Sequence, residues 1–90
     1  MLFMVIEHFR PGCAPEVYRR FRERGRMAPE GIQYIASWVD LEFHRCFQVM
    51  EARDEAHLRE WSVHWEDLVD FEVIPVRTSS DAAKVMGDRA

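Results

Sequence analysis

The chain has 90 residues and a formal net charge of -4 at pH 7, with 48% of its residues hydrophobic and 31% charged. Ninety residues make one domain with a thin core, since a chain of this length buries only about 60–65% of its unfolded surface. The acidic balance disfavours nucleic acid and anionic membranes as partners, and two cysteines are too few for a disulfide framework.

The first two predicted elements are a strand and a helix. Leu2 to Phe9 is predicted as a buried strand, because its central residues are apolar on both sides and Arg10-Pro11-Gly12 follows it. The apolar run at residues 1–6 is too short for a signal peptide or a membrane span, so we expect a cytoplasmic protein. A helix is predicted from Glu16 to about Met27, because apolar residues recur there three or four positions apart.

Two strands and a second helix are predicted for the middle of the chain. Ile32 to Leu41 and Arg45 to Glu51 form a hairpin through a polar turn that lacks an Asn-Gly or Asp-Gly signature. Asp54 is the predicted N-cap of a helix that runs to about Asp67. The apolar stripe of this helix is predicted to be Leu58, Trp61, Trp65 and Leu68.

The last predicted strand is Val69 to Val76, which ends near a proline. The element order is therefore β-α-β-β-α-β, the ferredoxin-like split βαβ arrangement. We predict the α+β class, with a four-stranded antiparallel sheet and two helices on one face. The domain is predicted to span residues 1–78, and residues 79–90 form a polar tail that is either a short helix or frayed.

Alternation along the strands divides their residues between two faces of the sheet. The more uniformly apolar face is predicted to lie under the helices: Leu2, Met4, Ile6, Tyr34, Ala36, Trp38, Phe47, Val49, Phe71 and Val73. The other face is apolar with four polar residues: Phe3, Val5, Glu7, Ile35, Ser37, Val39, Cys46, Gln48, Met50, Glu72 and Ile74. Left bare, it would exceed the apolar patch that monomers usually expose, so we predict a homodimer closed by this face.

Several short motifs run through the chain: MLFMVIE at 1–7, VYRRF at 17–21 with RGR at 24–26, PEG at 29–31, SWV at 37–39, RCFQ at 45–48 and FEVIPV at 71–76. Over residues 1 to about 80, the chain resembles a family of small, mostly bacterial proteins catalogued only as a domain of unknown function. The resemblance implies membership of the dimeric α/β barrels, a group that includes cofactor-independent antibiotic-biosynthesis monooxygenases, haem-degrading enzymes and stress-response proteins. It implies a fold and a dimer but no reaction.

Six residues are candidates for lining a cavity in the dimer barrel, and no catalytic role is assigned to them: Glu7, His8, Ser37, Cys46, Gln48 and Glu72. Glu7 and Glu72 either share a proton inside the barrel, with one raised pKa, or lie at its wet rim. His8 is either a base or haem ligand at the pocket mouth or a plain surface histidine. Cys46 is better explained as a buried structural thiol than as a nucleophile.

No metal site, cofactor motif or nucleic-acid signature is predicted. His57 and His64 share a helix face but stand about 10 Å apart along its axis, so we expect two solvated histidines. RNA-recognition domains have the same order of elements. Phe3 stands at the strand-one position where those domains carry an aromatic residue. However, the strand-three signature of those domains is absent, and the arginines lie on a helix away from the sheet.

Three function classes stay open. The first is a dimer that binds a small apolar or amphipathic molecule in each barrel, and this class is favoured. The second is an enzyme of the monooxygenase or haem-handling kind, which requires a perturbed acid, base or metal in the same cavity. The third is a structural or interaction protein with a filled barrel. A cavity of about 300 Å³ or more with convergent polar groups would favour the first two classes.

Overall fold

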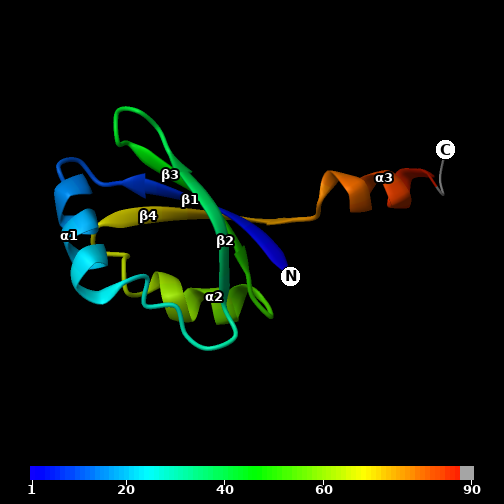
Figure 1. The fold of residues 1–90 in the computed structure, drawn as a ribbon, viewed down its shortest axis with the longest axis horizontal. Coiled ribbons are helices and arrows are strands. Elements are labelled where there is room, and N and C mark those ends of the chain that lie inside the picture. Colours follow the sequence, from blue (N-terminus) through cyan, green and yellow to red (C-terminus); the bar gives the residue numbers. More distant parts are fainter. Residues whose placement is uncertain (88–90) are drawn as a thin grey trace.

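The computed structural model describes residues 1–87 and has one four-stranded antiparallel sheet in the order β2-β3-β1-β4. Two helices cover one face of this sheet (Figure 1). The α+β, ferredoxin-like arrangement predicted from the sequence is therefore confirmed. The elements are β1 (Leu2–Phe9), α1 (Ala14–Arg24), β2 (Gln33–Val39), β3 (Arg45–Glu51), α2 (Glu55–Ser62), β4 (Val69–Val76) and α3 (Ser79–Gly87).

The two covering helices both end earlier than predicted. The helix α1 ends at Arg24 because Gly25 leaves it with φ 67°, a region that glycine adopts without steric cost. The helix α2 begins at its predicted cap, where Asp54 Oδ1 accepts the His57 N–H at 2.7 Å. After Ser62 the chain continues in turns with i to i−3 hydrogen bonds, such as Trp65 N to Ser62 O at 3.0 Å.

The core lies between the sheet and these helices. The predicted assignment of the two sheet faces is wrong for β1, β3 and most of β2, and right for β4, where Phe71 and Val73 pack against the core. Phe3, Val5 and Met50 are 0% exposed beneath the helices, whereas Trp38, predicted to lie there, is 60% exposed on the opposite face. Glu7 and Gln48 share the buried face. Burial of this mixed face is tolerated because its polar side chains hydrogen-bond to one another.

A bulge in β2 also alters the predicted alternation. The pairing of β2 with β3 shifts between Tyr34 and Ala36. Tyr34 pairs with buried Met50 and so belongs to the helix-covered side, while Ala36 pairs with Val49 on the uncovered side. A bulge places two residues opposite one, so two-residue alternation fails across it.

The uncovered face of the sheet has an apolar centre and charged ends. One central row crosses the sheet through Trp38, Phe47, Ile6 and Glu72, and the next through Ala36, Val49, Met4 and Ile74. Beyond the first row lie Arg45, His8 and Asp70. Glu51 lies beyond the second row and pairs with the terminal amine at 2.8 Å. We refer to this surface below as the open face.

The third helix, α3, extends away from the sheet and its two covering helices (Figure 1). None of its residues is buried, and Thr78 Oγ1 accepts the Asp81 N–H at 3.0 Å at its start. Of the two states expected for the tail, the structure has the short helix up to Gly87, and the remaining tail residues lie outside the described range. The domain division at residue 78 stays a prediction.

Within residues 1–87, no helix has both the length and the apolar character that a membrane crossing requires.

Candidate functional site

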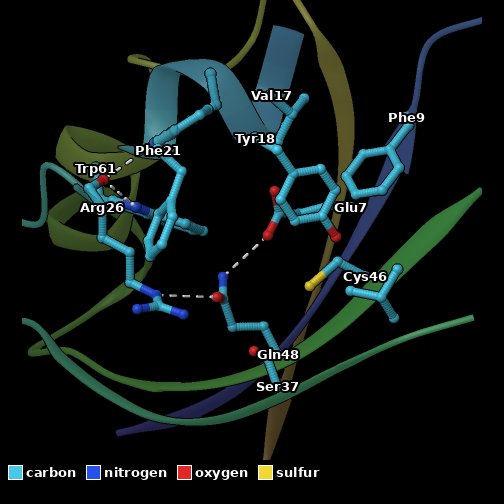
Figure 2. A pocket seen from close by; sticks show the side chains of 12 residues that line it. Glu7, Phe9, Val17, Tyr18, Phe21, Arg26, Ser37, Cys46, Gln48 and Trp61 are labelled. Carbon is cyan, nitrogen blue, oxygen red and sulfur yellow. Dashed lines mark hydrogen bonds between the residues drawn. The ribbon is translucent and has the colours of Figure 1, made fainter. Parts of the chain in front are cut away.

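A cavity of about 130 Å³ lies between the sheet, α1, and α2 with the turns that follow it (Figure 2). Most of its lining is apolar and comes from all of these elements. The apolar and aromatic residues are Phe9, Val17, Tyr18, Phe21, Val39, Trp61 and Trp65. The polar residues are Glu7, Arg26, Ser37, Cys46 and Gln48.

Three of the polar residues, Glu7, Gln48 and Arg26, form a short chain of hydrogen bonds in the cavity (Figure 2). Gln48 Nε2 donates to Glu7 Oε2 at 3.1 Å, and Arg26 Nε donates to Gln48 Oε1 at 3.5 Å. Glu7 and Gln48 come from neighbouring strands, whereas Arg26 follows α1. The amide of Gln48 therefore bridges a buried acid and a partly exposed cation.

Burial raises the pKa of Glu7 to about 7, against the opposing effects of the Cys46 thiol and the positive charge of Arg26. A carboxyl group with this pKa is present in both protonation states near neutral pH. It can therefore donate or accept a proton near neutral pH, as a general acid or base must.

Cys46 is unsuited to nucleophilic chemistry in this environment. Burial, together with the neighbouring carboxyl of Glu7, raises the pKa of the Cys46 thiol to about 12. The thiolate is the nucleophilic form of cysteine, and this form is disfavoured here. The buried, protonated thiol agrees with the interpretation that the sequence favoured.

Arg26 is held in place by its backbone and by two aromatic rings. The indole N–H groups of Trp61 and Trp65 both donate to the Arg26 carbonyl oxygen, at 3.0 and 3.1 Å. The guanidinium carbon lies 3.4 Å from the Tyr34 ring centroid and 5.2 Å from that of Phe21. Such cation–π contacts orient the cation as well as stabilise it.

The structure separates the six candidate residues into two groups. Glu7, Ser37, Cys46 and Gln48 line the cavity, which lies on the helix side of the sheet. His8 and Glu72 lie on the open face, where Nε2 and Oε1 are 3.2 Å apart.

The hypothesis of a proton shared by Glu7 and Glu72 is therefore wrong. In the register of β1 and β4, Glu7 pairs with Phe71 and Glu72 pairs with Ile6. Side chains of adjacent residues on a strand point to opposite faces, so the sheet itself separates the two carboxyl groups.

Arg26 and the aromatic residues of the lining were not predicted as site residues from the sequence. One usable signal was the glycine within Arg24-Gly25-Arg26, because a glycine that ends a helix turns the next residue out of the helical path. The two indole bonds to Arg26 join residues 35 and 39 positions apart, and no local pattern indicates them.

His57 is buried rather than solvated, which corrects the prediction for this residue. Its Nδ1 accepts the Arg53 N–H at 3.1 Å, so its Nε2 carries the proton and faces the Glu30 carbonyl at 3.3 Å. His64 is exposed, as expected. Across residues 1–87, no three His, Cys, Asp or Glu side chains are grouped so that they could hold a metal ion.

Arg20 of α1 and Phe3 of β1, two residues considered for nucleic-acid binding, both have structural roles instead. Arg20 forms two hydrogen bonds with the Asp67 carboxylate, at 2.8 and 2.7 Å, which joins α1 to the segment after α2. Phe3 is 0% exposed and faces the helices. It therefore cannot stack on a nucleic-acid base in the way that RNA-recognition domains require.

A second hollow of about 400 Å³ lies between α2 and β4. Its charged residues are all exposed: Arg10, Glu55, Arg59, Glu66 and Asp70. Charges in contact with water interact weakly with a ligand. The smaller cavity, with its buried acid, is therefore the better candidate site.

Residues 1–90 match one family model, described as Domain of unknown function (DUF3303). Neither the curated proteins nor the solved structures contain a significant match to the chain. The family description names no activity, so the function has to be inferred from the geometry of the site.

Proposed function

The chain belongs to the family described as Domain of unknown function (DUF3303), and on that premise we propose that it is a homodimer that binds one small molecule in the cavity of each subunit. The observation that carries this proposal is the buried acid Glu7 in a lining that is otherwise largely apolar. Ligand sites usually combine an apolar lining with a few convergent polar groups, and this cavity has that composition.

The volume of the cavity limits the size of its ligand. At about 130 Å³ it is smaller than the roughly 300 Å³ at which sites for drug-sized molecules begin. A dry cavity of about 150 Å³ is nevertheless large enough to bind benzene. We therefore propose a ligand of about one ring in size, or a larger one of which only one ring enters.

The homodimer is proposed because of the composition of the open face. Its centre contains Trp38, Phe47, Ile6 and Met4, and charged residues stand at both ends. An apolar centre within a polar rim is the usual anatomy of a protein interface. A second copy of the chain presents the same apolar centre, so two copies laid face to face would form the dimeric α/β barrel.

In such a dimer, the space between the two sheets would be filled by the side chains of the open face. This agrees with the filled barrel of the third function class. It does not conflict with ligand binding, because the cavity beside Glu7 lies on the other side of the sheet.

Proton-transfer catalysis of the cofactor-independent monooxygenase kind is the second candidate function. It is favoured by Glu7, whose pKa of about 7 suits it to take a proton from an acidic O–H or C–H group of a bound molecule. The haem-handling alternative is disfavoured, because a macrocycle several rings in size does not fit a cavity of about 130 Å³. His8, considered earlier as a haem ligand, faces away from the cavity.

The proposal is tested with freshly purified protein in two measurements. Native mass spectrometry should report two subunits and any small molecule that purifies with them. An NMR screen of single-ring compounds should shift the indole N–H signals of Trp61 and Trp65, which line the cavity, and leave that of exposed Trp38 in place. A monomer at micromolar concentration would refute the dimer. Absence of indole shifts with every compound would refute the ligand site.

A further inference from the structure

The guanidinium of Arg26 brings to the cavity a positive charge that is in direct contact with no acid of the described chain. Within residues 1–87, Arg26 forms no ion pair. The one hydrogen bond found for its side chain is the 3.5 Å contact from Nε to Gln48, at the long limit for such a bond. Two other arginines differ from it: Arg20 is paired with Asp67 and Arg19 with Glu16.

The stacking of Arg26 fixes the direction in which its remaining donors can act. Tyr34 and Phe21 contact the guanidinium within cation–π distance, and the two indole bonds hold its backbone. Ring contacts use the face of the planar group and leave the N–H bonds in its plane free to donate. The terminal nitrogens, Nη1 and Nη2, have no acceptor among residues 1–87 and can form a fork for a planar anion.

We propose that Arg26 binds the anionic group of the ligand, and that the ligand is a small acid whose apolar part fills the cavity. This inference rests on the proposed function and adds the chemical class of the molecule. A carboxylate suits the arrangement, because its two oxygens match the two terminal nitrogens of arginine. The ring of an aromatic acid would contact Val17, Phe21 and Trp61.

Glu7 lies in the same cavity and determines when such an acid can bind. Two carboxylates in one small, largely apolar cavity repel each other, so the ligand anion requires the protonated form of Glu7. The other groups that face Glu7 cannot replace that proton. Gln48 is neutral, the Cys46 thiol is protonated, and burial also raises the pKa of Tyr18. Arg26 carries the one positive charge of the described lining. Binding should therefore take up a proton above pH 7.

The test compares benzoate with benzyl alcohol, which has the same ring without the charge, by calorimetric titration at pH 6. Wild-type protein should bind benzoate at least about tenfold more tightly, as expected for a charge-assisted hydrogen-bonded pair. Arg26→Gln should remove this preference by weakening benzoate binding about tenfold more than benzyl alcohol binding. Arg22→Gln, an exposed change on α1, serves as the matched control and should keep the preference.

The outcomes separate the failure of this inference from that of the proposed function. Equal affinities of wild-type protein for the two compounds would overturn the anion site and leave the ligand cavity standing. The same holds if Arg26→Gln keeps the preference. If neither compound binds at millimolar concentration, both proposals fail. The indole bonds use the main-chain oxygen of Arg26, so the variant is expected to fold, and thermal unfolding should show this.

Discussion

The amide nitrogen of Gln48 donates to Glu7 Oε2 at 3.1 Å on the helix-covered face of two neighbouring strands. This bond explains how the chain buries two polar side chains on the helix-covered face of its sheet. A buried polar group that lacks a partner costs about 1–3 kcal/mol, whereas a pair of such groups satisfies itself. Burial, and not this bond, keeps the pKa of the Glu7 carboxyl group near 7.

Replacement of Glu7 by Gln should remove a pH dependence of folding stability. The folded state raises the pKa of Glu7 from 4.5 to about 7, so it holds the proton more tightly than the unfolded chain does. The contribution of Glu7 is therefore fully present below pH 4.5 and is lost as the pH rises to 7. The loss is about 3 kcal/mol.

Urea unfolding at pH 5 and pH 8 measures this effect. The Glu7→Gln variant should match the wild type at pH 5 and exceed it by about 1–3 kcal/mol at pH 8. Glu60→Gln, an exposed change on α2, is the control and should follow the wild type at both values. Equal losses of stability by wild type and Glu7→Gln on going to pH 8 would show that Glu7 does not hold this proton.

The Cys46 thiol should resist alkylation while the protein is folded. Its pKa of about 12 leaves almost no thiolate at pH 8, and the side chain is 8% exposed at most. In a Cys13→Ser variant, iodoacetamide should label Cys46 only after urea is added, as read by mass spectrometry. Rapid labelling of the folded variant would contradict both the burial and the raised pKa.

The order of the elements could be predicted from the sequence because each strand is an apolar run bounded by glycine, proline or polar residues. The strands β1, β3 and β4 have the predicted bounds, and α2 begins at its predicted cap. These features depend on residues close together in the chain. Local sequence patterns report such features well.

The covered face of the sheet could not be predicted in the same way. Alternation sorts side chains into two sets but does not say which set the helices cover. In β1 and β3 the buried residues include Glu7 and Gln48, because these two side chains satisfy each other. Their pairing depends on the register of the two strands, which the sequence does not give. The bulge after Tyr34 and the place of Arg26 likewise depend on contacts between distant residues.

Gly31→Ala should destabilise the protein more than Gly12→Ala. Both glycines have positive φ, at 89° and 75°, so an added side chain is strained at either position. A Cβ atom at residue 31 would also lie 3.1 Å from His57 Cε1, whereas one at residue 12 meets nothing within 4 Å. His57 cannot withdraw easily, because both of its ring nitrogens face backbone partners.

Thermal or urea unfolding of the two glycine variants isolates the His57 contact. Gly12→Ala should cost about 1–2 kcal/mol for its backbone conformation alone. Gly31→Ala should cost about 1 kcal/mol more, in the lower part of the range for overpacked sites. Equal costs would mean that the His57 ring moves aside freely and does not fix the Glu30–Gly31 turn.

Trp38→Lys should convert the proposed homodimer into a monomer. Trp38 is 60% exposed in the central row of the open face, where it pairs with Phe47, the neighbour of Ile6 on the next strand. A buried lysine without a partner costs several kcal/mol at an interface, whereas on an exposed strand it costs little. The control is Val63→Lys, which places the same charge at an exposed apolar residue at the end of α2, on the helix side.

Light scattering at micromolar concentration should report a monomer for Trp38→Lys and a dimer for both Val63→Lys and wild type. Circular dichroism should show that both variants are folded. If Trp38→Lys is a folded dimer, the two copies meet through another surface, and the open face needs a different explanation.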